Sequence, residues 1–264
     1  MEKAASLYES DSAIVLGKDD EYLITEKTLI IIKAPIETTI SIITRNDCEL
    51  RTVKGCSLFF LDGRTRLHVS NRLCNCRKIR LESVASLLVF MDMANGISEH
   101  SYSNKSWNYQ IKEVSPELFE NDNEFKKWLI FSYIIKEKSI EPLLNFIRAS
   151  EEYQIIFFLL KKTVCDDISS IKKLCKEYGL SYSHFRRLCY KALGKPVKEE
   201  LEKWKIMNTY FDCVEHDDSL TFHAINNGFS SSSHFSNAVK KFTGYSPRDL
   251  KNVNFIKKWR TKDD

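Results

Sequence analysis

The sequence of 264 residues predicts an α+β protein with a small β-structure and helices in its N-terminal part. Its C-terminal part is predicted to be all-α, a tandem helix-turn-helix domain whose two units are joined by a long linker helix. Three observations support this fold class: β-branched runs before residue 70, helical periodicity after residue 115, and a segment that recurs after about fifty residues. With 43% hydrophobic residues but only 8 Gly and 5 Pro, the chain has the composition of one large or two modest globular domains.

Short β-branched runs predict the strands of the N-terminal part. They cover residues 28–33, 38–44 and 67–70, and Gly, Pro and Asn-Asp turn signals separate them. Apolar residues at steps of three and four then predict a helix over residues 81–95, which Gly96 ends. Residues 107–114 are interpreted as one more strand.

Helical periodicity continues over residues 124–137, 141–148 and 151–162. The chain has no signal-peptide pattern, and its apolar runs are far shorter than the roughly 20 residues that span a membrane. We therefore expect a cytoplasmic protein with no membrane association. Among 8 cysteines only Cys74 and Cys76 are close neighbours, which is weak evidence for a metal site. We expect no metal, no cofactor and no catalytic residue.

A repeat near the C-terminus is the most informative feature. Residues 181–185 read Ser-Tyr-Ser-His-Phe, and residues 231–235 read Ser-Ser-Ser-His-Phe. Upstream, Gly179 pairs with Gly228 at an offset of 49 residues. A short helix precedes each glycine and another follows it, which is the helix-turn-helix plan. Ser181, and either Ser231 or Ser232, are predicted to cap the second helix of each unit.

The spacing of apolar residues assigns faces to these second helices. Residues predicted to point inward recur at i, i+3, i+4 and i+7, namely Phe185, Leu188, Cys189 and Ala192 in one copy and Phe235, Ala238, Val239 and Phe242 in the other. Residues predicted to point outward are Ser183, Arg186, Arg187 and Tyr190, then Ser233, Ser236, Asn237 and Lys240. Both outward faces contain hydrogen-bond donors and no acid.

A helix over about residues 196–214 is predicted to join the two units, with Trp204 in its core-facing part. Eighteen residues of helix extend about 27 Å. If this helix holds the two units at a separation near the roughly 34 Å repeat of B-DNA, the two outward faces are predicted to enter successive major grooves. Residues 166–264 contain 18 Lys and Arg against 13 Asp and Glu, so most of the net charge of +4 lies in this half.

The C-terminal part of the sequence resembles a known protein family. Residues 168–252 resemble the tandem helix-turn-helix domain of AraC/XylS transcription regulators, most similarly the InvF/MxiE-type activators of type III secretion genes in enteric pathogens. The matching positions are Ala224, Gly228-Phe229, Ser233, Phe235, Lys240-Lys241, Gly244 and Ser246-Pro247. The resemblance implies double-stranded promoter DNA, RNA polymerase and a type III secretion chaperone as partners, the chaperone acting as co-activator. His223, Asn227 and Lys205 depart from the family pattern.

The resemblance and the face assignment together select the candidate DNA-binding residues. They are Ser183, Arg186, Arg187, Tyr190, Ser232, Ser233, Ser236, Asn237 and Lys240. An Arg can bind guanine in a bidentate manner and an Asn suits adenine, whereas Lys240 is expected to contact phosphate. Whether Arg186 and Arg187 read bases or contact phosphates stays open.

We therefore expect a regulatory or interaction domain over residues 1–160 and a DNA-binding domain over residues 165–255. The predicted function is sequence-specific activation of transcription, and whether the chain forms a homodimer is left open. One alternative is an interaction adaptor that keeps the fold without binding DNA. An enzyme that uses His184 with Cys189, or His234 with its serines, is disfavoured because Cys189 lies on the predicted buried face.

Overall fold

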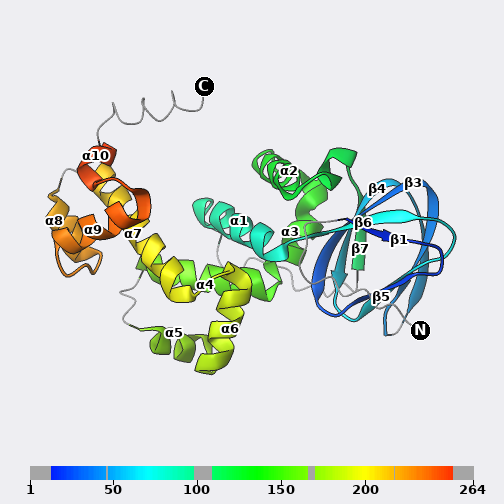
Figure 1. Cartoon of the computed structure of the whole chain (residues 1–264), viewed down its shortest axis with the longest axis horizontal. Coiled ribbons are helices and arrows are strands. Elements are labelled where there is room, and N and C mark those ends of the chain that lie inside the picture. The colour runs from blue at the N-terminus through cyan, green and yellow to red at the C-terminus, as the bar shows by residue number, and fades with distance from the viewer. Residues whose placement is uncertain (1–12, 46, 98–108, 166–169, 217, 252–264) are drawn as a thin grey trace. The chain divides into compact units, whose positions relative to one another are not determined.

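The computed structural model describes residues 13–45, 47–97, 109–165, 170–216 and 218–251. The chain divides into two compact units, Met1–Gln154 and Ile155–Asp264, and the division falls within a helix. We call them the N-terminal unit and the C-terminal unit. Figure 1 shows strands and helices in the first and helices alone in the second. The protein is thus α+β, as the sequence predicts.

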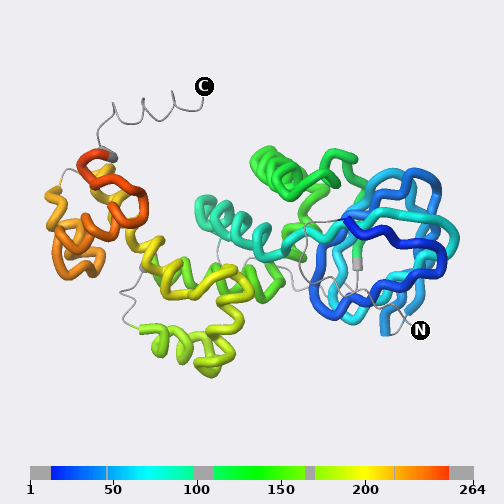
Figure 2. The backbone as a smooth tube through the Cα atoms, viewed as in Figure 1, coloured from blue at the N-terminus to red at the C-terminus, as the bar shows by residue number. Residues whose placement is uncertain are grey.

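An antiparallel sheet of seven strands forms the core of the N-terminal unit. Its strands are β1 (Ile14–Leu16), β2 (Glu21–Ile24), β3 (Lys27–Ile43), β4 (Cys48–Asp62), β5 (Thr65–Val69), β6 (Cys74–Ile79) and β7 (Tyr109–Glu113). They pair in the order β1-β6-β3-β4-β7, and β5 joins β2 to β3. The strands curve around a common interior (Figure 2), where Ile30, Ile42 and Phe59 are buried.

The expected separate strands 28–33 and 38–44 were wrong, because both belong to the long strand β3. Pairing with β4 runs from Lys27–Asp62 to Ile43–Cys48, with a shift of register between Ala34 and Thr38. Pro35 lies within this irregularity. A proline has no N–H to donate to a ladder, so it is tolerated where regular pairing is interrupted.

Helices follow the sheet in the N-terminal unit. They are α1 (Leu81–Ala94), the 3₁₀ turn η1 (Pro116–Phe119), α2 (Asp122–Ile134), η2 (Lys138–Ile140), α3 (Glu141–Arg148) and α4 (Glu151–Cys165). Helix α2 starts before the predicted Glu124, because the Asn121 side chain caps it by accepting from the N–H groups of Asn123 and Glu124.

A buried polar network ties four helices of the N-terminal unit together. Asp92 of α1 is 0% exposed, and its carboxylate accepts two hydrogen bonds of 2.8 Å from the Arg148 guanidinium of α3. It also accepts from the hydroxyls of Tyr133 in α2, at 2.8 Å, and Tyr153 in α4, at 2.7 Å. Burial and the bond to Asp92 raise the pKa of Tyr133 above its ordinary value.

The C-terminal unit continues from α4 with short helices. They are α5 (Ile171–Tyr178), α6 (Tyr182–Leu193), α7 (Val197–Glu215), α8 (Leu220–Asn226), α9 (Ser232–Thr243) and α10 (Pro247–Lys251). These bounds agree with the predicted helices and turns of the repeat. Within the described ranges, no helix combines the length and the apolar composition needed to cross a membrane.

Candidate nucleic-acid interface

Helices α5 and α6 form the first helix-turn-helix. Gly179 ends α5 in the left-handed region at φ 80°, and the Ser181 side chain caps α6 by accepting from the N–H of His184. Phe185 is 0% exposed and its ring lies 5.8 Å from that of Tyr178 on α5. Leu188, Cys189 and Ala192 are also buried, so the predicted inward face is confirmed.

The predicted outward face of α6 is exposed. Ser183, Arg186, Arg187 and Tyr190 are all open to solvent. The Arg186 guanidinium lies 5.6 Å from the ring centroid of Tyr182, a half-exposed residue that the sequence analysis did not select. This contact steadies one of the two arginines at the start of the helix. Tyr182 therefore joins the candidate interface.

Helices α8 and α9 form the second helix-turn-helix. Ser231, not Ser232, is the cap of α9, because its hydroxyl accepts from the N–H of His234 at 3.1 Å. Phe235 and Val239 are buried on the inward face. The prediction for Phe242 was wrong, since its side chain is 44% exposed. It lies in the last turn of α9, where the ammonium of Lys203 is 5.8 Å from its ring.

The outward face of α9 is more polar and less charged than that of α6. Ser233, Asn237 and Lys240 are exposed, whereas Ser232 and Ser236 are partly buried. Hydroxyl and amide groups dominate this face. It is suited to hydrogen bonding with base edges more than to binding phosphates.

Two histidines complete the parallel between the helices. His184 and His234 occupy matching positions in the first turns of α6 and α9, and both are exposed. The Nδ1 atom of His234 lies 3.0 Å from the hydroxyl of Ser230. The repeated Ser-His-Phe sequence was the signal for these residues, but the sequence analysis considered the histidines only as possible bases of an enzyme.

Helix α7 joins the two helix-turn-helix units. It contains 19 residues, which corresponds to about 28 Å of helix. Val197 and Leu201 are buried near its start, as are Ile206 and Cys213 farther along. Trp204 is only partly buried, so its assignment to the core was wrong. Thr209 is buried on the same helix, where its hydroxyl donates to the Lys205 carbonyl at 2.8 Å.

The net charge differs sharply between the two helix-turn-helix motifs. Six exposed cations lie on α5 and α6, namely Lys172, Lys173, Lys176, Arg186, Arg187 and Lys191. The one acid on these helices, Glu177, binds Lys162 at 2.9 Å. By contrast, residues 206–239 contain no Lys or Arg, and α9 supplies only Lys240 and Lys241. The first unit therefore attracts a polyanion more strongly than the second.

The departures from the family pattern have structural roles. His223 is 3% exposed on α8, its ring stacks near that of His216, and its Nε2 atom has no hydrogen-bond partner among the described residues. Asn227 donates to the Asp212 carboxylate of α7 at 2.7 Å and to the His223 carbonyl. One departure leaves a buried polar atom unpaired, whereas the other connects two helices.

We expect His223→Leu to stabilise the second helix-turn-helix. Leucine removes a buried nitrogen without a partner, whose desolvation typically costs about 1–3 kcal/mol. Urea unfolding of the full chain measures the change, with the exposed His216→Leu as the control. If His223→Leu instead has a lower free energy of unfolding than the wild type, the imidazole stabilises the fold through its packing.

The thiol of Cys189 is not activated as a nucleophile. Burial raises the pKa of the Cys189 thiol to about 12, so it is protonated at neutral pH. Cys74 and Cys76 are buried on β6 with 4.0 Å between their sulfur atoms. Across the described part of the chain, no group of three or more His, Cys, Asp or Glu residues is placed to hold a metal ion.

Comparisons with known proteins agree with this geometry. A family model described as a helix-turn-helix domain matches residues 174–252. The chain is 31% identical over 201 residues to the transcriptional regulator MxiE of Shigella flexneri, covering 76% of this chain and 96% of MxiE. It is 32% identical over 177 residues to the invasion protein InvF of Salmonella typhimurium, covering 67% of this chain and 81% of InvF.

Among solved structures, ToxT from Vibrio cholerae covers 91% of this chain and 96% of its own at 14% identity, with a TM-score of 0.39. The evidence for the family is the matched domain together with the two relatives, which align over most of their own lengths. This chain therefore belongs to the AraC/XylS family of transcription regulators.

Proposed function

We propose that this protein is a sequence-specific DNA-binding activator of type III secretion and virulence genes. The observation that carries the proposal is the pair of exposed, acid-free helix faces on α6 and α9, joined by α7. Similarity to proteins named transcriptional regulator and invasion protein supports the class of target gene.

In this proposal α6 and α9 enter successive major grooves on one side of the duplex. At least one of Arg186 and Arg187 makes a bidentate contact to guanine N7 and O6 in this proposal, and such a pair contributes about 1–3 kcal/mol of discrimination. In α9, Ser232, Ser233 and Ser236 hydrogen-bond to base edges, Asn237 pairs with adenine, and Lys240 contacts phosphate. Ser183 enters the groove with the arginines, and Tyr190 lies nearer the DNA backbone.

The remaining partners follow from the family resemblance. The DNA-binding domain over residues 165–255 acts with RNA polymerase in the cytoplasm, and residues 1–160 form the regulatory domain, which binds a type III secretion chaperone as co-activator. The protein acts by binding and not by catalysis. Footprinting of a target promoter with the chain alone and with the purified chaperone tests this part; an identical footprint and identical transcription in vitro would refute a co-activator.

The second candidate is an adaptor that keeps the fold without binding DNA. The absence of Lys and Arg over residues 206–239 favours it. The two functions differ in salt dependence, because each neutralised phosphate contributes about −0.9 to the slope of log K against log salt. An activator that uses about five cations should give a slope near −4 to −5 on promoter fragments. A flat response would support the adaptor.

Arg187→Ala should lower specific DNA binding while changing the free energy of unfolding by less than about 0.5 kcal/mol, because the side chain is exposed. Arg187→Lys distinguishes the two kinds of contact, since lysine keeps the charge but loses the bidentate fork. If Arg187 reads a base, the lysine variant also loses discrimination between target and scrambled duplexes. Wild-type discrimination by the lysine variant would assign Arg187 to phosphate contact, and clear unfolding of Arg187→Ala would contradict the face assignment.

A further inference from the structure

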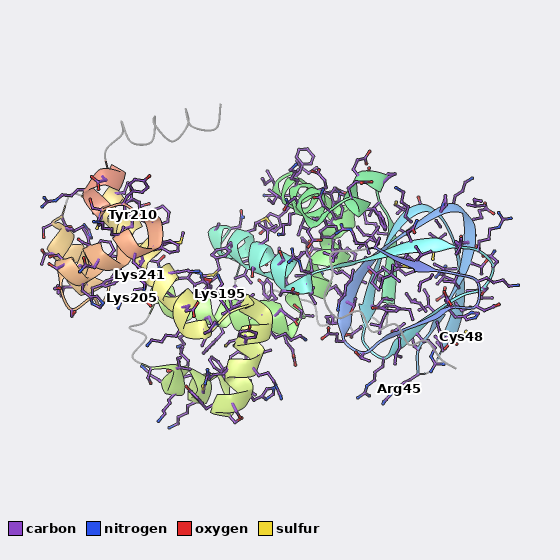
Figure 3. All side chains as sticks on the ribbon, viewed as in Figure 1. Arg45, Cys48, Lys195, Lys205, Tyr210 and Lys241 are labelled. Carbon is purple, nitrogen blue, oxygen red and sulfur yellow. The ribbon has the colours of Figure 1, made fainter. Side chains whose placement is uncertain are left out.

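Helix α7 holds the turn of the second helix-turn-helix through two polar contacts. The Lys205 ammonium donates to the Gly228 carbonyl at 2.6 Å and lies 4.6 Å from the centroid of the Phe229 ring. Two helical turns farther along α7, the Asp212 carboxylate accepts from the Asn227 amide at 2.7 Å. Three consecutive turn residues, 227–229, are therefore fixed to α7. Figure 3 labels Lys205 on this helix.

This turn controls the placement of α9. Gly228 adopts a left-handed conformation at φ 74°, and Phe229 packs on Phe235 with 5.1 Å between the ring centroids. Phe235 is the buried anchor of α9. A shift of the turn relative to α7 is thus transmitted to α9 through a packed aromatic pair.

Connections of similar length join α7 to its neighbours at both ends. Three residues separate it from α6, which ends at Leu193, and four separate it from α8, which begins at Leu220. At its far end, the second unit meets α7 through a small apolar cluster with Ile206 and Cys213, and through the two polar contacts. Apolar packing is not directional, whereas a charged hydrogen bond sets a specific geometry.

We propose that Lys205 and Asp212 are positioning residues that set the register of α9 relative to α6, and so the spacing of half-sites that the protein accepts. The inference rests on the proposed DNA binding. Neither residue touches a base in this account. Lys205 acts through Gly228 and Phe229, and Asp212 acts through Asn227. Lysine is also the departure from the family's usual arginine, which can make the same contacts with its guanidinium.

The test uses the full chain and a duplex of about 40 base pairs obtained by in vitro selection with the wild type. Three forms of the duplex are compared: the selected one, one with the second half-site scrambled, and one with two base pairs inserted between the half-sites. The variants are Lys205→Met, Lys205→Arg and Asp212→Ala, and the exposed Lys198→Met is the matched control for loss of one charge on α7.

We expect Lys205→Met to bind the selected duplex about tenfold more weakly and the scrambled duplex as the wild type does, because only the tethered second unit is misplaced. Lys205→Met should also lose the preference of the wild type for the selected duplex over the duplex with two base pairs inserted between the half-sites. Lys205→Arg should restore both properties, Asp212→Ala should resemble Lys205→Met, and Lys198→Met should keep the spacing preference.

Outcomes against the inference are distinct from those against DNA binding. If the wild type selects no duplex, the proposed function fails and the inference fails with it. If the wild type selects a duplex with two protected grooves and Lys205→Met keeps the spacing preference, the inference alone is overturned. Equal weakening on the selected and scrambled duplexes would also overturn it, because it would show a general loss of fold. If Lys205→Met does not fold, the same comparison with Asp212→Ala decides.

Discussion

Asp92→Ala is expected to lower the free energy of unfolding of the N-terminal unit by about 3–5 kcal/mol, because it leaves a buried guanidinium without its main partner. The Asp92 carboxylate accepts four hydrogen bonds that join α1, α2, α3 and α4. Burial opposes the charge on Arg148, but the bonds and charge of Asp92 and the charge of Glu141 outweigh it and raise the pKa of Arg148. Removing Asp92 takes away both of its hydrogen bonds to the guanidinium, whereas the contact of Glu141 with Arg148 at 3.3 Å is longer.

Urea unfolding followed by the fluorescence of Trp128 on α2, in a background where the other three tryptophans are replaced by Phe, measures this change in the N-terminal unit. The control is Asp62→Ala, which removes an exposed carboxylate that contacts Lys27 at 3.7 Å and should change stability by less than about 1 kcal/mol. The loss of stability in Asp92→Asn should lie between those of Asp92→Ala and Asp62→Ala, since the amide keeps the shape of the side chain but not its charge. Equal stability of Asp92→Ala and Asp62→Ala would mean that the network does not hold the four helices.

Phe235→Ala is expected to destabilise the second helix-turn-helix by about 3–5 kcal/mol, as truncation of a fully buried aromatic side chain leaves a cavity. Phe235 is 0% exposed and packs on Phe229. The matched control is Phe242→Ala on the same helix, which removes a half-exposed ring near Lys203 and should cost no more than about 1 kcal/mol.

Thermal unfolding of the full chain and protection of the second half-site in footprints are the two measurements. Phe235→Ala should lose that protection while keeping the footprint of α6, because the first unit has its own core around Phe185. Similar melting of Phe235→Ala and Phe242→Ala would contradict the inward assignment of Phe235.

The sequence was most successful in predicting helices whose ends are determined by nearby residues in the chain. Helix α3 has the predicted bounds 141–148, and α5 ends before Gly179 as predicted, because Pro142 near the start of one and Gly179 at the end of the other are local signals. The faces of α6 followed from helical spacing and the burial of Phe185.

Tertiary contacts explain what the sequence could not predict. The spacing of apolar residues in α1 gave no sign that Asp92 is buried, because its burial depends on the pairing with Arg148 from another helix. The contact of Lys205 with Gly228 joins residues 23 positions apart, and no local pattern reports it. Strand β3 passes through Pro35 because its partner β4 continues on both sides.

The uneven charge of the two helix-turn-helix units has a kinetic consequence. Long-range attraction to phosphates acts through cations and weakens with ionic strength, so the first unit, with six exposed cations, should lead the encounter with a duplex. The second unit, with two, adds hydrogen bonds only after contact. We expect the salt concentration to govern how fast this protein arrives at a promoter, whereas the base sequence facing α9 governs how long it stays.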